Sequence, residues 1–319
     1  MLTVKDLKTY FYTDAGCAKA VDGVSFSVDK GRVLGIVGES GCGKSVTSLS
    51  IMGLLDPVTA RVEGGQILFH DQDLLKLTPA QMRKLRGDRI SMIFQEPMTS
   101  LNPVLTIGYQ IEEALMLHRG LDKAAARART IELLKMVGIP EPGKRIDEYP
   151  HQLSGGMRQR VMIAMALSCD PELLIADEPT TALDVTIQAQ ILALLTELRE
   201  RLGMAIIIIS HDLGVISEMA DDVMVMYAGQ VVECAPGEQL LENPLHPYTI
   251  GLMNSVPDIT KSVKRLRALD GMVPNLYNMP DGCRFAPRCE QCHEACKTGE
   301  IPLSVLPDGR QVRCILYGT

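Results

Sequence analysis

The stretch that decides the fold is Gly38-Glu39-Ser40-Gly41-Cys42-Gly43-Lys44-Ser45, which matches the pattern G-x-x-x-x-G-K-[ST] in full. An apolar run, Val33 to Val37, comes directly before it and predicts a buried strand, and a helix is expected to follow. Glycines let consecutive backbone N–H groups turn inward around phosphates, and the helix N-terminus adds positive charge. We expect Lys44 to reach the β- and γ-phosphates and the Ser45 hydroxyl to bind Mg²⁺. The full match between strand and helix argues against a glycine-rich turn without chemical function.

Periodic segments on both sides of this loop predict the fold class. A half-exposed strand is expected at Val21 to Val28, because apolar and polar residues alternate there. Strands alternating with helices predict an α/β fold with a mainly parallel sheet. The other expected strands are Arg89 to Phe94, Leu173 to Ala176 and Ala205 to Ser210, and the expected helices are Gly108 to Val137, with a break near His118-Arg119-Gly120, and Val185 to Arg201.

The composition argues against several classes of protein. The chain has 319 residues, of which 46% are apolar, and a formal net charge of −7. Since phosphate backbones attract cationic surfaces, this charge argues against a nucleic-acid partner. Apolar runs such as Ala205 to Ile209 are far shorter than the ~20 residues that span a bilayer, and Met1 to Tyr10 is no basic-then-apolar leader. We therefore expect a soluble, cytosolic chain that other subunits would have to hold at a membrane.

Two carboxylates end a second apolar run, Leu173-Leu174-Ile175-Ala176-Asp177-Glu178. Asp177 is expected to hold Mg²⁺, often through water, as the acidic residue at a strand end does in phosphate-loop ATPases. Glu178 is then placed to polarise an attacking water as a general base. A helix cap is the alternative for Asp177, because Asp often begins a helix. The complete phosphate loop in the same chain favours the catalytic interpretation.

A phosphate loop alone is compatible with kinases, GTPases, helicases and transporters. One further segment distinguishes among these classes of protein. Leu153-Ser154-Gly155-Gly156-Met157-Arg158-Gln159-Arg160 resembles the ABC-family signature L-S-G-G-x-x-x-R, just upstream of the acidic pair. The Ser-Gly-Gly turn opens a helix, so that N–H groups and the Ser154 hydroxyl face an anion. The resemblance implies that this anion is the γ-phosphate on another subunit, with Ser154 and Gly156 acting across a dimer that sandwiches two nucleotides.

The resemblance to the ABC family covers the whole chain and implies the remaining landmarks in order. Gln95 resembles the Q-loop glutamine, Ala182-Leu183-Asp184 the D-loop, and His211 the switch histidine that contacts the γ-phosphate. Tyr12 is the aromatic residue expected to stack on adenine, with Phe11 as the alternative. The implied fold is an α/β, ABC-type P-loop ATPase domain with a RecA-like parallel-sheet core, an antiparallel β subdomain and a helical subdomain.

The implied site residues fall into three sets. Those expected to bind ATP are Tyr12, Gly38, Ser40, Gly41, Cys42, Gly43, Lys44, Ser45, Val46, Gln95, Ser154, Gly156 and Asp177. Those expected to act in catalysis are Glu178, His211, Gln95 and Lys44. Those expected to hold Mg²⁺ are Ser45, Gln95 and Asp177.

Within the ABC family, three segments resemble the branch that imports peptides and nickel. They are Phe94 to Pro103, Tyr149-Pro150-His151-Gln152 and His246-Pro247-Tyr248-Thr249. The chain is most similar to dipeptide/oligopeptide importer ATPases. This implies a second ABC ATPase subunit in a heterodimer, two transmembrane permease subunits and an extracytoplasmic peptide-binding protein that acts through the permeases. It also implies a peripheral position at the cytoplasmic face of the inner membrane.

Two other functions stay open beside peptide import. Nickel or another small solute is the first alternative, because this subunit never touches the cargo. The second is a soluble ABC ATPase that works on DNA or ribosomes, which is less favoured because such proteins usually carry tandem cores or a long coiled-coil insertion.

The sequence changes in character near Asn243, because prolines are frequent from there on and apolar residues show little periodicity. We therefore expect an ABC ATPase domain over residues 1–255 and a small Cys-rich C-terminal extension over residues 256–319. The resemblance implies that this extension holds a [4Fe–4S] cluster on four thiolates, which would staple a segment poor in apolar periodicity. Zn²⁺, which could use the Cys289-x-x-Cys292 pair, and unligated thiols are the alternatives. The four implied cluster ligands are Cys283, Cys289, Cys296 and Cys314.

Overall fold

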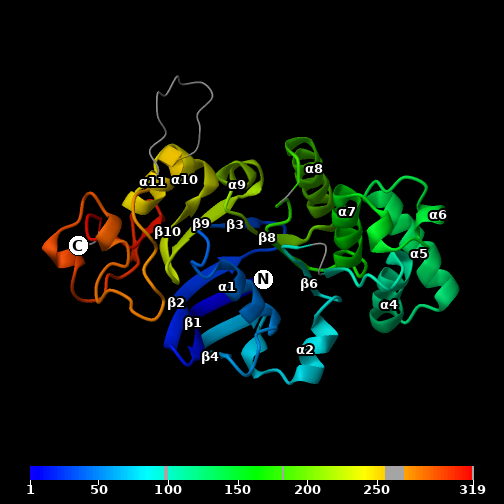
Figure 1. Cartoon of the computed structure of the whole chain (residues 1–319), viewed down its shortest axis with the longest axis horizontal. Helices are drawn as coiled ribbons and strands as arrows, with labels where there is room; N and C mark the ends of the chain where they lie inside the picture. Colours follow the sequence, from blue (N-terminus) through cyan, green and yellow to red (C-terminus); the bar gives the residue numbers. More distant parts are fainter. Residues whose placement is uncertain (97–99, 182, 256–268, 318–319) are drawn as a thin grey trace. The chain divides into compact units, whose positions relative to one another are not determined.

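A computed structural model describes residues 1–96, 100–181, 183–255 and 269–317 of the chain. Two compact units can be distinguished. Unit 1 consists of Met1–Val28, Val33–Leu75 and Ser210–Thr319, and unit 2 of Asp29–Arg32 and Lys76–Ile209. Figure 1 traces the chain through both. The predicted boundary after residue 255 falls next to residues 256–268, which lie outside the described residues, and it stays a prediction.

Unit 1 contains a four-stranded antiparallel sheet in the order β2-β1-β4-β5, coloured blue to cyan in Figure 1. The strands are β1 (Leu2–Thr13), β2 (Gly16–Val28), β4 (Ala60–Phe69) and β5 (Gln72–Asp73). In β1, Leu2, Val4 and Leu7 are fully or almost fully buried, whereas the end of the strand is exposed. Burial of one face of an alternating strand against a core is what stabilises such a sheet. The half-exposed strand predicted at Val21 to Val28 is the second half of β2.

Unit 1 also contains five strands of a mixed sheet, in the order β11-β12-β10-β9-β3. Strand β3 (Val33–Val37) runs parallel to β9 (Asp222–Tyr227), whereas β10 (Gln230–Pro236) runs antiparallel to β9. The short strands β11 (Ser304–Val305) and β12 (Gln311–Val312) continue this antiparallel part, and Glu233 of β10 pairs with Val312. The sheet is therefore less parallel than the sequence predicted, because β10 runs antiparallel to β9 and the segment after residue 269 adds two short antiparallel strands.

The helices of unit 1 are short. They are α1 (Lys44–Met52), α9 (Leu213–Met219), α10 (Gly237–Glu242) and α11 (Pro247–Ser255), with single 3₁₀ turns at Ala286–Arg288 and Glu294–Cys296. Helix α9 packs so closely on β3 that a Cβ atom on Gly35 would lie 2.7 Å from Cγ2 of Ile216. Only glycine allows this approach of helix to strand.

Unit 2 contains three parallel strands in the order β8-β7-β6, which are β6 (Ile90–Ile93), β7 (Leu173–Asp177) and β8 (Ala205–Ile209). Every residue of β7 and β8 is buried, as the continuous apolar runs predicted. The helices are α2 (Pro79–Leu85), α4 (Ile107–Arg119), α5 (Lys123–Met136), α6 (Pro142–Arg145), α7 (Gly155–Ala166) and α8 (Val185–Leu202).

The predicted break in the long helical stretch is present, and its cause is local. Helix α4 ends at Arg119 because Gly120 adopts the left-handed conformation, with φ of 65°. Helix α5 begins after Asp122, whose side chain accepts a hydrogen bond from the N–H of Ala125. The chain therefore forms two helices, α4 and α5, although apolar residues recur at helical spacing through the whole stretch.

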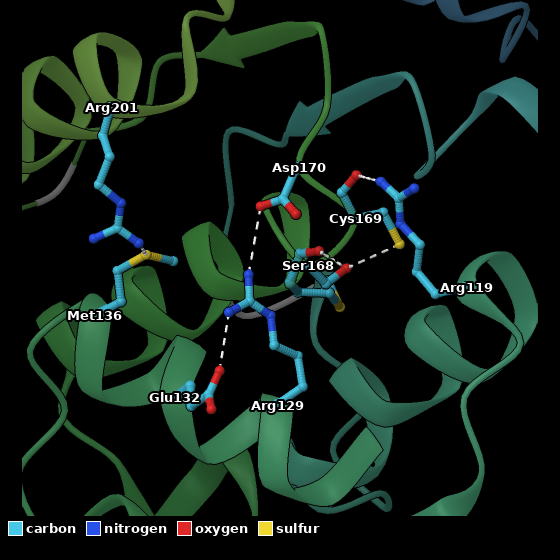
Figure 2. A network of polar contacts seen from close by, with 9 residues as sticks. Arg119, Arg129, Glu132, Met136, Ser168, Cys169, Asp170 and Arg201 are labelled. Carbon is cyan, nitrogen blue, oxygen red and sulfur yellow. Dashed lines mark hydrogen bonds and ion pairs between the residues drawn. The ribbon is translucent and has the colours of Figure 1, made fainter. Parts of the chain in front are cut away.

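Polar contacts tie these helices to the loop between α7 and β7, as Figure 2 shows. Arg129 on α5 pairs with Glu132 one turn later, at 3.0 Å, and reaches Asp170 in the loop at 3.5 Å. Arg119, at the end of α4, donates to the backbone oxygen of Cys169 in the same loop. Two arginines from successive helices therefore fix the loop that connects the end of α7 to the start of β7.

Among the described helices, none combines the length and apolar character needed to cross a membrane.

Candidate functional site

The phosphate loop lies in unit 1 between β3 and α1, as the sequence predicted. Two of its glycines are required by space as well as by backbone conformation. A Cβ atom on Gly38, with φ of 152°, would lie 2.2 Å from the carbonyl oxygen of Met226. A Cβ atom on Gly43, with φ of 104°, would lie 2.3 Å from the carbonyl oxygen of Ala20. Because real Cβ contacts are never so short, both positions accept only glycine in this loop conformation.

Lys44 is the first residue of α1, and its side chain folds back over the loop. Its Nζ donates to the carbonyl oxygens of Gly38, at 2.7 Å, and Glu39, at 3.1 Å. Residue Lys44 is only 6% exposed. The ammonium group therefore lies inside the turn of the loop, where a phosphate group would meet it together with the N-terminus of α1.

The remaining loop residues differ in exposure. Ser40 and Gly41 are exposed, Ser45 and Val46 in the first turn of α1 are both half-buried, and Cys42 is fully buried. Burial raises the pKa of the Cys42 thiol. Cys42 therefore stays a neutral thiol at physiological pH and supports the loop by packing.

Two side chains that the sequence analysis did not single out also hold the loop. The N–H of Glu39 donates to the Tyr248 hydroxyl at 2.8 Å, and the Glu39 carboxylate accepts two hydrogen bonds from Arg288. Tyr248 lies on α11 and Arg288 in the 3₁₀ turn Ala286–Arg288, far along the chain. Tyr248 belongs to the His246-to-Thr249 segment quoted above for its resemblance, whereas no sequence pattern marks Arg288.

The acidic pair lies in unit 2, at the end of β7. Asp177 is buried and Glu178, the next residue, has a left-handed backbone with φ of 48°, which is rare for a residue with a side chain. This turn of the backbone directs Glu178 away from the strand. Its Oε2 accepts hydrogen bonds from Nε2 of Gln95 and from the Thr181 hydroxyl, both at 2.9 Å. The structure thus brings together Gln95 and Glu178, which the sequence places 83 residues apart.

The signature segment begins helix α7 in unit 2. Ser154 is the N-cap residue, and its hydroxyl oxygen accepts a hydrogen bond from the N–H of Met157 at 3.3 Å. The hydroxyl proton can then be donated to an anion in front of the helix. Ser154 and Gly155 are exposed, and a Cβ atom on Gly156 would meet Cγ2 of Ile187, on α8, at 3.0 Å. The helix N-terminus is therefore open to solvent, and its close approach to α8 favours glycine at position 156.

The signature helix is also tied to the segment that follows the acidic pair. Buried Gln159 of α7 donates through Nε2 to the carbonyl oxygen of Pro179, at 2.6 Å. Pro179 follows Glu178 directly. One hydrogen bond therefore links the helix that carries the signature to the turn that carries the predicted general base.

The other predicted landmarks have these positions. Tyr12 lies on β1, is 40% exposed and donates its hydroxyl to Glu63 at 2.7 Å, which raises the pKa of Tyr12 to about 12. Phe11 beside it is half-buried. His211 follows β8 and is exposed, and Asp184 caps α8 by accepting from the N–H of Ile187 at 3.0 Å. Ala182 of the predicted D-loop lies outside the described residues.

The four predicted cluster cysteines line one small apolar cavity in unit 1, together with His246, Phe285 and Ile301. Cys292 is not among the lining residues. Backbone contacts hold the set together, because the N–H of Cys283 donates to the carbonyl oxygen of Cys296 at 2.7 Å. Burial raises the pKa of Cys283, Cys289 and Cys314, to about 11 for Cys289, so a metal ion would have to displace the thiol protons. Across the part of the chain that the structure describes, no three His, Cys, Asp or Glu side chains are grouped closely enough to hold a metal ion, and the cluster is not confirmed.

Comparison with family models gives two matches along the chain. The model of the ABC transporter family matches residues 21–181, a range that contains the phosphate loop, the signature and the acidic pair. The model of the oligopeptide/dipeptide transporter C-terminal region matches residues 232–296.

Two curated relatives are similar over almost their whole length. The oligopeptide transport ATP-binding protein AppD of Bacillus subtilis is 55% identical over 317 residues, which cover 99% of this chain and 97% of AppD. The dipeptide transport ATP-binding protein DppD of Escherichia coli is 51% identical over 314 residues, which cover 98% of this chain and 96% of DppD.

Solved structures with the same fold support this comparison. The dimeric cassette MJ0796, in a post-hydrolysis state with ADP and Pi, superposes with a TM-score of 0.66 at 31% identity, over 74% of this chain and 98% of that chain. The cbiO1 subunit of the Clostridium perfringens ABC transporter complex cbiONQ gives a TM-score of 0.64 at 28% identity, over 76% of this chain and 90% of that chain.

Proposed function

Because the chain belongs to the ABC transporter family, we propose that it is the ATP-hydrolysing subunit of a transporter that imports dipeptides or oligopeptides. The match of residues 232–296 to the oligopeptide/dipeptide transporter C-terminal region is the observation that carries the cargo class. AppD and DppD are ATP-binding proteins of oligopeptide and dipeptide transport, which supports the same cargo.

ATP is bound, in this proposal, by the phosphate loop, and the acidic pair takes part in its hydrolysis. Lys44 and the N–H groups around Gly41 and Gly43 hold the phosphates, and Tyr12 stacks on adenine. Glu178 accepts a proton from the attacking water, and its two hydrogen bonds fix the direction of its carboxylate. His211 contacts the γ-phosphate.

Mg²⁺ suits the oxygen donors available, which are the Ser45 hydroxyl at the start of α1, the Gln95 amide and the Asp177 carboxylate. It would neutralise charge on the phosphates when bound. The residues themselves hold and orient the phosphates, so that the in-line attack becomes an intramolecular event.

Ser154 and Gly156 are proposed to act on nucleotide that a second ATPase subunit binds. The exposed N-terminus of α7 supports this, because an open helix N-terminus with a Ser hydroxyl is an anion site. The dimeric state of MJ0796 supports the same arrangement. We propose a heterodimer of two ATPase subunits that closes on ATP and thereby moves two permease subunits. An extracytoplasmic peptide-binding protein would deliver the peptide to the permeases, and this chain would lie at the cytoplasmic face of the inner membrane.

The four cysteines that line the small cavity are proposed to hold a [4Fe–4S] cluster in a Cys-rich C-terminal extension. Four cysteine thiols around one cavity provide the donor set that iron–sulfur clusters and zinc use. The four thiolates would hold the cluster and so cross-link a segment that forms little regular secondary structure of its own.

The proposed function is tested by reconstitution. The chain would be co-expressed with its permeases, second ATPase and binding protein, and the purified complex placed in liposomes. We expect ATPase activity that rises on addition of loaded binding protein, together with uptake of a labelled dipeptide or tripeptide. A complex with Lys44→Ala in this chain is the control and should lose both.

Two outcomes would contradict the proposal. Uptake of Ni²⁺ without uptake of peptides would refute the peptide cargo while keeping the transport ATPase. Failure of the chain to bind ATP, or to assemble with any permease, would refute the transport function itself.

A further inference from the structure

Glu39, the second residue of the phosphate loop, is held at three of its groups. Its carbonyl oxygen accepts from Lys44 Nζ at 3.1 Å, its N–H donates to the Tyr248 hydroxyl at 2.8 Å, and its carboxylate pairs with Arg288. The side chain is 29% exposed. Glu39 thus carries a negative charge in the one loop where a polyphosphate is proposed to bind.

All the N–H donors of Arg288 have acceptors, and two of them bind the Glu39 carboxylate. Nη1 donates to Oε2 of Glu39 at 2.6 Å and to the Tyr227 hydroxyl at 3.3 Å, and Nη2 donates to Oε1 of Glu39 at 3.0 Å and to the carbonyl oxygen of Leu269 at 3.3 Å. Nε donates to the carbonyl oxygen of Asp270 at 2.9 Å. A guanidinium group has five N–H donors, and these five contacts account for every one.

The surroundings of the guanidinium group show that it is built into the fold. The Arg288 side chain is only 3% exposed, and its guanidinium carbon lies 5.7 Å from the ring centre of Tyr227 and 5.9 Å from that of Phe285. The hydrogen bonds to Glu39 raise the pKa of Arg288, so the group stays charged. Tyr227 and Phe285 are themselves buried, so the guanidinium group lies against two aromatic rings of the core.

We propose that Arg288 is a positioning residue for nucleotide binding. It neutralises the Glu39 carboxylate and holds it against the C-terminal segment. The backbone of Gly38 and Glu39 then presents its carbonyl oxygens to Lys44, and no uncompensated negative charge faces the phosphates. This inference rests on the proposed function, because it requires that the loop binds ATP.

A purely structural role for Arg288 would be to fasten the C-terminal segment to the rest of unit 1. The two roles differ in what Glu39 does when the arginine is lost. If Arg288 only fastens the segment, removing the Glu39 charge as well cannot help. If Arg288 neutralises Glu39, removing that charge restores ATP binding, because the repulsion disappears with it.

The experiment measures ATP affinity of the full chain in its transporter complex, by titration with a fluorescent ATP analogue and by the KM of the ATPase reaction. Arg288→Gln should weaken ATP binding roughly tenfold. The KM for ATP should rise accordingly, with little change in kcat. Arg288→Lys, which keeps the charge but loses the bidentate fork, should fall between Arg288→Gln and the wild type. The double variant Glu39→Gln/Arg288→Gln should return to within about threefold of the wild-type affinity.

Arg310→Gln is the matched control. Arg310 is another poorly exposed arginine of the same segment, with its side chain 12% exposed, and it pairs with Asp308 at 2.8 Å and with the Asn243 carbonyl at 3.0 Å. Its loss should leave the ATP affinity unchanged.

Two results would overturn the inference: an unaltered affinity in Arg288→Gln, or a double variant that binds as weakly as Arg288→Gln. A wild-type complex that does not bind ATP would instead refute the proposed function on which the inference rests. Comparing wild type with Lys44→Ala in the same titration separates the two failures.

Discussion

Replacing Glu178 by Gln should abolish most of the ATPase activity while leaving ATP binding intact. Gln has the shape of Glu, and its amide oxygen can accept the two hydrogen bonds that Gln95 and Thr181 now give to Oε2 at 2.9 Å. The end of β7 should therefore keep its arrangement. The amide, however, cannot accept a proton from water.

The size of the effect follows from the role of a general base. Such groups contribute about 10²- to 10⁴-fold to a rate. Two hydrogen bonds already fix the Glu178 carboxylate in one direction, so the base needs little reorganisation and we place the loss at about 10³-fold. At 1.36 kcal/mol per factor of ten, this is a barrier higher by about 4 kcal/mol.

The assay is the steady-state ATPase rate of the purified transporter complex, with ATP affinity measured on the same preparation. Glu172→Gln is the matched control, because Glu172 directly precedes β7, at the opposite end of the strand, and pairs with Arg89. It should change the rate less than about twofold, as surface substitutions away from special features usually do. Wild-type turnover by Glu178→Gln, or loss of ATP binding along with turnover, would show that Glu178 is not the base.

Three further predictions concern the loop, the signature and the cysteines. Gly43→Ala should lower the free energy of unfolding by about 3 kcal/mol, because its Cβ would meet the Ala20 carbonyl oxygen at 2.3 Å. Gly41→Ala, whose Cβ would meet no atom within 4 Å, should cost only about 1–2 kcal/mol. Equal losses in thermal unfolding would contradict this difference between the two positions. Gly156→Ala should leave the ATP affinity of the isolated chain unchanged and lower the ATPase rate of the complex about tenfold. The reason is that Ile187 must move by a few tenths of an ångström to make room for the new Cβ atom. Weaker ATP binding by the isolated chain would contradict action in trans. Cys289→Ser should remove iron and visible absorption from anaerobically prepared protein, while Cys292→Ser keeps both; about one zinc per chain in the wild type, or no metal, would refute the cluster.

The parts of the fold that could be predicted are those set by local sequence. Buried strands at Val33 to Val37, Leu173 to Ala176 and Ala205 to Ser210 were predicted because continuous apolar runs of this length form central strands. The division of the stretch from Gly108 to Val137 into two helices followed from Gly120, which ends a helix in the left-handed conformation.

The parts that could not be predicted depend on contacts between distant segments. The pairing of β12 with β10 gives the sheet an antiparallel edge, and two-residue strands such as Gln311–Val312 have no periodicity to detect. The left-handed backbone of Glu178 was equally hidden, since Glu has no preference for that conformation. The roles of the site residues themselves stay predictions that the substitutions above would test.

The ion pair between Glu39 and Arg288 joins residues 249 positions apart, and this separation has a consequence for synthesis on the ribosome. At about 5–20 residues per second, a ribosome needs roughly 12–50 s to add 249 residues. During that interval the growing chain already contains the whole glycine-rich motif, but the guanidinium that neutralises Glu39 does not yet exist. A nascent chain, or one released before residue 288, therefore carries the motif without its charge partner. Tight ATP binding would then mark a chain whose synthesis has passed that point.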